Sequence, residues 1–255
     1  HTSYSADAGM VGNRLPPTQA YRFARGETVT ATLGYQARLR RPLDFLVVAD
    51  HAESLGIAPL VTSNDPLAQA DPIGARLIAL VTSGDLGGAY RLFAGERRAG
   101  RSPLHTDAIR RPMWDRIVAA AEEYNQPGRF TTFIGYEYTS APRGDNLHRV
   151  VIFADGRDKA GQILPFSANE SNNPEDLWSF MANYERSVGG QVLAIAHNGN
   201  LSNGRMFDDA TFGGQALTAD YARLRQRWEP LYEVTQMKGD GETHPILSPD
   251  DEFAG

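Results

Sequence analysis

Acidic and histidine side chains follow apolar segments at several points along this 255-residue chain. The segment DFLVVADHAESLG carries four consecutive apolar residues at 45–48 and then Asp50, His51 and Glu53. Buried charges are costly unless something binds them. This pattern therefore predicts that a ligand, such as a metal ion, offsets the cost of placing polar groups at the end of a buried strand.

Other apolar segments end in the same way. Glu137 lies near the end of one segment, His197 and Asn198 close another, and Glu233 falls within a third. Histidine and carboxylate ligands without thiolate suit zinc, manganese or iron. Two or three such ions can activate a water molecule and clamp a phosphoryl group.

The apolar, β-branched segments predict strands, and the stretches between them have helical spacing or good helix formers. Strands are expected near 43–50, 130–139, 147–155, 191–198 and 231–236. Helices are expected near 17–26, 73–83, 112–125 and 173–190. The last of these has Asn173 as a possible N-cap, Pro174 at the first helical position and two glycines at its end.

Strands that are apolar on both faces and alternate with helices predict an α/β fold with a mainly parallel sheet, either a barrel or an open sheet. In such folds the carboxyl ends of the strands carry the sites, because the loops there converge. The polar residues at the strand ends are therefore expected to meet in one place.

The composition excludes several classes of protein. With 41% hydrophobic and 22% charged residues, the chain is long enough for one large domain. The net charge of −6 gives no general attraction to nucleic acid or to an anionic membrane. The absence of cysteine excludes disulfides, thiolate metal sites and cysteine nucleophiles. We find neither an apolar run of 18 residues nor a signal-peptide pattern.

Five motifs, in this order, resemble those of the PHP (polymerase and histidinol phosphatase) superfamily of metal-dependent phosphoesterases: HTSYSADAG, DFLVVADHAESLG, GYEYTS, NLHRVVIF and AIAHNGN. The nearest branch is domain-of-unknown-function family 3604, and the resemblance spans 1–255 as a single, partial domain. It implies a distorted, TIM-like (β/α)7 barrel that holds two or three divalent ions, zinc or manganese, with iron also compatible. It also favours a periplasmic or exported location over the cytoplasm.

The resemblance also implies roles for individual residues. Glu137 matches a carboxylate that bridges two metals, and Asp50 matches either a ligand or a partner that orients an imidazole. The implied metal ligands are His1, Asp7, His51, Glu137, His148 and His197, and the implied catalytic residues are Asp50, Glu137 and His197. The expected substrate-binding residues are Arg149, Asn198, Arg205, Lys238, Glu242 and His244.

Each of these residues also has an ordinary structural explanation. A single histidine at a strand end is often only hydrogen-bonded, Asp7 could be a loop acid, and the two arginines could be surface charges. His105, in the polar loop RSPLHTDAIRR, lies outside any strand end and is expected to be a bystander.

The chain departs from the PHP pattern at both ends. His1 and Thr2 match only the second half of a His-x-His motif, and the late Asp-x-His motif is absent. We therefore expect a chain that is truncated at the N-terminus and incomplete at the C-terminus of its barrel. The stretch KGDGETHP, with Glu242 and His244, could line the pocket or form a polar turn.

The expected function is hydrolysis of phosphate or phosphonate esters of a small phosphorylated substrate by a metal-activated water. A metal-dependent amide or ester hydrolase would use the same ligands. A non-catalytic domain that metal ions merely stabilise is the alternative from another class. Neither a nucleic acid nor a membrane is expected as a partner.

Overall fold

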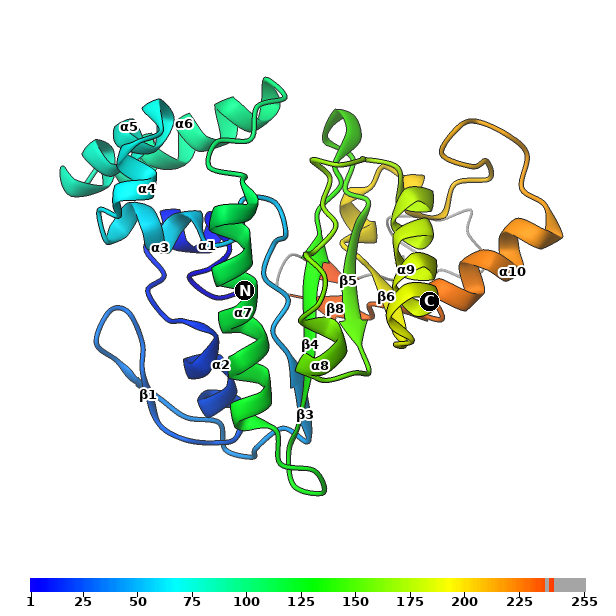
Figure 1. Ribbon diagram of the computed structural model, residues 1–255, viewed down its shortest axis with the longest axis horizontal. Coiled ribbons are helices and arrows are strands. Elements are labelled where there is room, and N and C mark those ends of the chain that lie inside the picture. Colours follow the sequence, from blue (N-terminus) through cyan, green and yellow to red (C-terminus); the bar gives the residue numbers. More distant parts are fainter. Residues whose placement is uncertain (237–238, 241–255) are drawn as a thin grey trace. The chain divides into compact units, whose positions relative to one another are not determined.

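The computed structural model describes residues 1–236 and 239–240 and has a mixed α/β architecture (Figure 1). The chain divides into two compact units. Unit 1 comprises His1–Tyr136 and Phe153–Pro165, and unit 2 comprises Glu137–Ile152 and Phe166–Gly255. The first division falls inside strand β4 (Thr131–Tyr138).

Helices account for most of the regular secondary structure of unit 1. The longest, α7 (Asp107–Tyr124), contacts α2 (Pro17–Ala24) along one side (Figure 1). The others are α1 (Ala6–Met10), α3 (Ile57–Thr62), α4 (Pro66–Gln69), α5 (Pro72–Thr82), α6 (Leu86–Arg98) and α8 (Arg157–Ala160). In the part of the chain that the structure describes, we find no helix long and apolar enough to cross a membrane.

The start of α5 follows from a local capping arrangement. Asp71 accepts hydrogen bonds from the backbone N–H groups of Ile73 and Gly74, both at 2.8 Å, and Pro72 occupies the first helical position. A side-chain acceptor satisfies donors that have no partner inside the first turn. The predicted helix at 73–83 is confirmed to within one residue.

Helix α7 corrects one prediction, because it begins at Asp107 and not at Pro112. A proline inside a helix removes a hydrogen bond and is costly, which is why the sequence favours a start at that residue. Tertiary contacts hold the extra turn instead. Arg110 donates to the carbonyl of Pro165 at 2.5 Å, and Arg111 donates to those of Gly161 and Ile163, both at 2.9 Å.

The strands of unit 1 include a parallel pair, β3 (Phe45–Val47) and the first part of β4, with Phe45 opposite Thr131. A separate antiparallel hairpin joins β1 (Val29–Thr30) and β2 (Gln36–Ala37). Strand β3 is shorter than the predicted 43–50. Asp50 lies beyond the end of β3 and accepts hydrogen bonds from Thr2 and Ser5.

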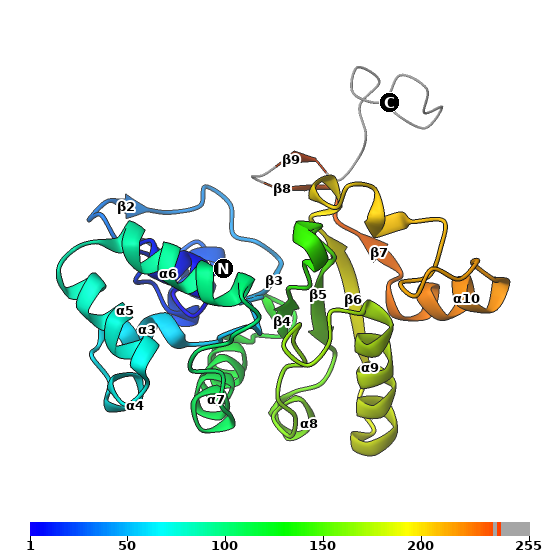
Figure 2. The ribbon, with the colours of Figure 1, turned by 90° about the horizontal axis from the view of Figure 1, so that it is seen from above.

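Unit 2 contains β5 (His148–Phe153, of which the last residue belongs to unit 1), β6 (Val192–His197) and β7 (Leu231–Tyr232), and β6 and β7 are parallel. Helices α9 (Pro174–Val188) and α10 (Ala219–Trp228) both contact β6 (Figure 2). Short 3-10 turns cover Pro142–Gly144, Gly199–Leu201 and Arg205–Phe207.

The predicted helix at 173–190 and its cap are confirmed. Asn173 accepts from the N–H of Glu175 at 3.0 Å, and Gly189 adopts a left-handed conformation just after the last turn. The predicted strand at 231–236 is instead two short strands, β7 and β8 (Thr235–Gln236), the second paired with β9 (Gly239–Asp240). The parallel pairs agree with the predicted parallel sheet, but a closed seven-stranded barrel is not confirmed in residues 1–236 and 239–240.

A buried ion pair joins three elements of unit 2. Arg149 of β5 donates to Glu229 at 2.8 Å, and the two side chains are 3% and 2% exposed. Glu229 also accepts from Trp178 of α9 and from Arg225 of α10. Burial raises the pKa of Glu229, but the arginine charges and hydrogen bonds outweigh it and the net pKa lies below its usual range.

We expect Arg149→Met to lower the free energy of unfolding by about 3–5 kcal/mol at pH 7, because it leaves Glu229 with less compensation for its buried charge. A depressed carboxylate pKa contributes stability that is present above the unfolded pKa and is lost as the pH falls through the folded one. The difference between variant and wild type should therefore shrink as the pH falls from about 5 towards 3. Urea denaturation followed by circular dichroism measures both effects.

The matched control is Arg223→Met, which removes an arginine that is 70% exposed and paired with the exposed Asp220. Exposed ion pairs contribute about 0–1 kcal/mol. An equal loss of stability in the two variants would contradict the assignment of Arg149 to a structural ion pair.

Candidate functional site

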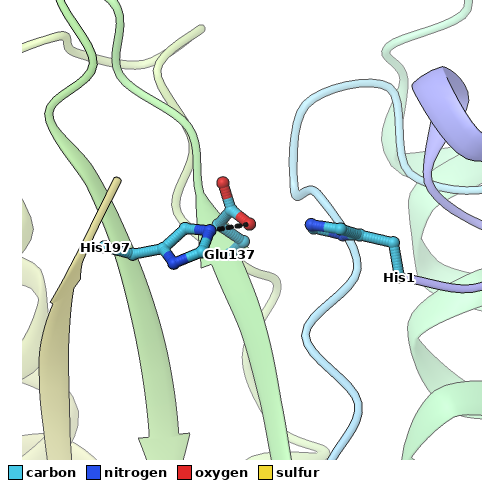
Figure 3. Close-up of side chains that lie close together, drawn as sticks. All are labelled: His1, Glu137 and His197. Atoms are coloured by element: carbon cyan, nitrogen blue, oxygen red, sulfur yellow. Dashed lines mark ion pairs between the residues drawn. The ribbon is translucent and has the colours of Figure 1, made fainter. Parts of the chain in front are cut away.

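One cluster of potential metal ligands lies in unit 2, centred on the carboxylate of Glu137. Its Oε1 lies 2.9 Å from Nδ1 of His148, and its Oε2 lies 3.6 Å from Nε2 of His197 (Figure 3, which marks the second contact). The Glu137 side chain is only 1% exposed. The two oxygens of one buried carboxylate thus face two different imidazoles.

A second carboxylate contacts the far nitrogen of His197. Oε1 of Glu233 lies 2.5 Å from His197 Nδ1, and its Oε2 accepts a hydrogen bond from the N–H of Asn198 at 3.0 Å. Glu233 comes directly after β7, which pairs with β6, so the two strands bring it beside the end of β6. His197 lies between two carboxylates, one on each ring nitrogen.

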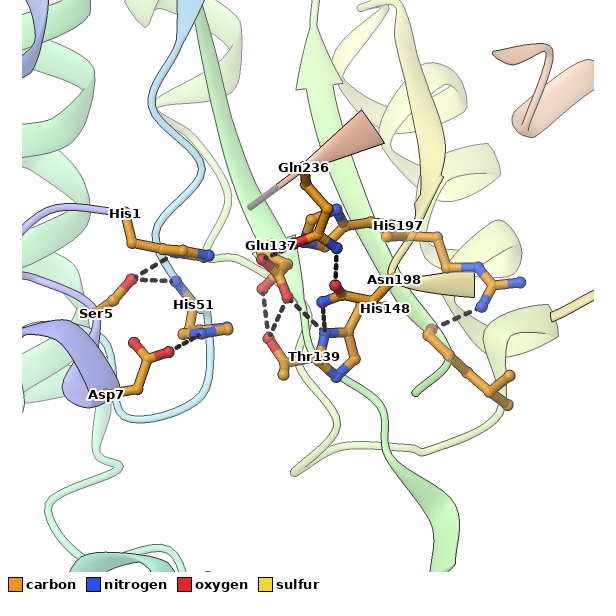
Figure 4. A network of polar contacts seen from close by, with 12 residues as sticks. His1, Ser5, Asp7, His51, Glu137, Thr139, His148, His197, Asn198 and Gln236 are labelled. Carbon is orange, nitrogen blue, oxygen red and sulfur yellow. Dashed lines mark hydrogen bonds and ion pairs between the residues drawn. The ribbon is translucent and has the colours of Figure 1, made fainter. Parts of the chain in front are cut away.

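Asn198 links this arrangement to His148. Its Nδ2 lies 3.1 Å from His148 Nδ1, and its Oδ1 accepts from Nε2 of Gln236 (Figure 4). The residue is fully buried and left-handed, with φ 61° and ψ 31°, a conformation that asparagine tolerates better than most residues. The side chain of Asn198, a predicted substrate-binding residue, therefore contacts His148 and Gln236.

A second cluster lies in unit 1. Nε2 of His51 is 3.1 Å from Oδ2 of Asp7, and the rings of His51 and His1 stack with their centroids 4.3 Å apart (Figure 4). Nδ1 of His1 lies 3.0 Å from the hydroxyl of Ser5. The structure thus brings three predicted ligands of this unit, His1, Asp7 and His51, to one place.

Asp50 lies behind this cluster. Its carboxylate, fully buried, accepts hydrogen bonds from the N–H and the hydroxyl of Thr2, both at 2.6 Å, and from the hydroxyl of Ser5 at 2.9 Å. The Ser5 hydroxyl in turn accepts from the N–H of His51 at 3.0 Å. Of the two roles left open by the sequence, these contacts favour the orienting one over that of a ligand.

The donor sets fit divalent metal ions. Ligand atoms that share an ion at about 2.1 Å lie roughly 3.0–3.4 Å apart in octahedral or tetrahedral geometry. The contacts of Glu137 with His148 and His197, at 2.9 and 3.6 Å, and of Asp7 with His51, at 3.1 Å, are close to this range. Nitrogen and oxygen donors of this kind suit zinc, manganese or iron.

The two predicted anion-binding arginines are engaged elsewhere in unit 2. Neighbouring residues of a strand point to opposite faces, so Arg149 lies on the other side of β5 from His148, where it pairs with Glu229. Arg205 pairs with Asp145 at 3.2 Å, and hydrogen bonds from Asn203 and Arg205 lower the pKa of that carboxyl. Their guanidinium groups are therefore held by carboxylates and do not join the Glu137 cluster.

The remaining predictions concern His105 and three residues near the end of the sequence. His105 lies in the loop before α7, and its role as a bystander stays a prediction. Lys238, Glu242 and His244 lie outside the described residues.

Sequence reasoning missed the supporting residues of both clusters. Ser5 and Gln236 carry no signal of their own, since serine and glutamine are common in loops. Glu233 was noted as an acid within a predicted strand but was given no role. An acid within an apolar strand is itself unusual, and that signal could have identified it.

The structure is that of a mixed α/β protein with two clusters of side chains, whose nitrogen and oxygen donor atoms suit divalent metal ions. The family model "Protein of unknown function (DUF3604)" matches residues 1–255. The chain therefore belongs to this family, as the motifs indicated. No curated protein and no solved structure matches the chain.

We expect Asp50→Ala to lower the free energy of unfolding by about 3–5 kcal/mol, because it leaves three buried donors without their acceptor. Thermal or urea unfolding of the metal-free protein measures the loss. Asp44→Ala, which removes an exposed aspartate six residues earlier, should change stability by about 0.5 kcal/mol or less. A loss no greater than that of the Asp44 variant would show that Asp50 does not anchor the N-terminal segment.

Proposed function

We propose that this protein is a metal-dependent phosphoesterase of the PHP type, and that its full fold is the distorted (β/α)7 barrel of that superfamily. The observation that carries the proposal is the carboxylate of Glu137, whose two oxygens face His148 and His197. The order of the five motifs along the chain supports the same assignment.

The proposed ligands are those of the two clusters. In unit 1 they are His1, Asp7 and His51, and in unit 2 they are Glu137, His148 and His197. Zinc or manganese fits these donors best, and iron also fits. When bound, such ions lower the pKa of a water molecule towards neutrality and offset the charge on phosphoryl oxygens.

The chain's own groups then have defined tasks. Glu137 supplies two oxygens from a buried position, one beside the imidazole of His148 and the other beside that of His197. Glu233 holds a proton on Nδ1 of His197, which leaves Nε2 on the side of Glu137. This chemistry needs no nucleophilic side chain, in agreement with the lack of cysteine and of a G-x-S-x-G motif.

The test begins with the metal content of the purified protein by elemental analysis. Hydrolysis of p-nitrophenyl phosphate, bis-p-nitrophenyl phosphate and p-nitrophenyl acetate is then compared with and without added manganese or zinc. Metal-dependent release from the phosphate esters alone would support a phosphoesterase, and release from the acetate alone would favour an amide or ester hydrolase. Protein without stoichiometric metal, even after addition of manganese or zinc, would overturn the proposal.

We expect Glu137→Ala and His51→Ala each to lower the bound metal and to abolish turnover, because each removes a ligand from a different cluster. His105→Ala should change neither quantity. Elemental analysis and the phosphate assay measure both, and circular dichroism confirms that the variants fold. Equal damage from His105→Ala would contradict the division between ligands and bystanders.

A further inference from the structure

We propose that Glu233 is a positioning residue. It determines which ring nitrogen of His197 carries the proton and how that ring is oriented, and through Asn198 it limits the movement of His148. This inference deepens the proposed function and rests on it where metal binding is concerned. All the contacts that carry it lie among the described residues of unit 2.

The first step is the contact of Glu233 with His197. A carboxylate oxygen can only accept a hydrogen bond, so the 2.5 Å contact with Nδ1 requires the proton on that nitrogen. In the neutral ring, Nε2 then carries the lone pair. That nitrogen lies 3.6 Å from Oε2 of Glu137, where a cation would be shared by both atoms.

The second step is the other oxygen of Glu233. It accepts from the backbone N–H of Asn198 at 3.0 Å and lies 3.3 Å from Nε2 of Gln236. One carboxylate thus fixes the His197 ring and the turn that follows it. Because Asn198 Nδ2 contacts the His148 ring at 3.1 Å, the same turn also restrains the second imidazole.

The third step concerns charge. The Glu233 side chain is 17% exposed, and that of His197 is 12% exposed, so their interaction is less screened than a surface pair. Carboxylates that bind the far nitrogen of a metal-ligating histidine fix its tautomer and the orientation of its ring. Their loss lowers metal affinity about 10–100-fold.

The experiment compares wild type with Glu233→Leu and Glu233→Gln in the full chain. We expect Glu233→Leu to weaken zinc binding about 10–100-fold, and Glu233→Gln, which keeps a neutral acceptor, to weaken it less. Competition with a chromogenic chelator measures the dissociation constants. Unfolding of the metal-free variants shows whether the fold is retained.

The matched control is Glu185→Gln. Glu185 lies in α9 with its side chain 26% exposed and pairs with Arg227, which is 61% exposed, at 2.5 Å. This variant should bind zinc as the wild type does. Equal weakening by the control would overturn a specific role for Glu233.

A second readout does not depend on metal. Long-range ¹H–¹⁵N spectra of the metal-free protein at alkaline pH report which ring nitrogen of His197 carries the proton. We expect Nδ1 in the wild type and a shift towards Nε2 in Glu233→Leu. Unchanged spectra in Glu233→Leu, or unchanged zinc affinity of that variant where the wild type binds zinc, would overturn the inference.

The two readouts separate the failure of this inference from that of the proposed function. A wild type that binds neither zinc nor manganese sinks the phosphoesterase proposal, and the expected change of tautomer in Glu233→Leu would still leave the positioning role of Glu233 intact. A wild type that binds zinc, with Glu233 variants that bind it equally well, sinks the inference and leaves the proposed function standing.

Discussion

The buried carboxylate of Glu137 is the constraint on which the organisation of unit 2 depends. A carboxylate that is 1% exposed is costly unless charged or hydrogen-bonding groups compensate for it. Strand β5 begins with His148 and strand β6 ends in His197, so an imidazole lies beside each of the two oxygens of Glu137. A second carboxylate, Glu233, then adds a further negative charge one imidazole away. Two acids and two imidazoles in so small a volume form a region that favours cations.

Unit 1 also contains a buried carboxylate, but there neutral hydrogen-bond donors stabilise it. Asp50 is fully buried, and its two oxygens accept three hydrogen bonds from Thr2 and Ser5. The same Ser5 hydroxyl contacts the backbone of His51 and the ring of His1. The cost of burying Asp50 is thus offset by a network that also orders the N-terminal segment. These contacts favour a role for Asp50 as an anchor of the N-terminal segment over a role as a metal ligand, because both of its oxygens already accept hydrogen bonds.

Local signals in the sequence predicted the presence of helices and strands better than the residues at which they begin and end. The helix after Asn173 could be predicted in full because its cap, its proline and its terminal glycine all act locally. The start of α7 could not, since Arg110 and Arg111 bind carbonyls some 50 residues away in the sequence. The strand predicted at 231–236 divides in two at Glu233, which the pairing of β6 with β7 brings beside His197.

The same distinction explains which site residues could be predicted. Histidines and acids at strand ends are visible in the sequence, and the structure gathers them into a cluster in each unit. Arg149 was equally visible, but the alternation of side chains along β5 directs it away from His148 and towards Glu229. A residue type therefore indicates what a side chain could do, whereas its strand face decides which partner it meets. For Glu233 that partner is the imidazole of His197, so an acid without an assigned role becomes the group that determines which nitrogen faces Glu137.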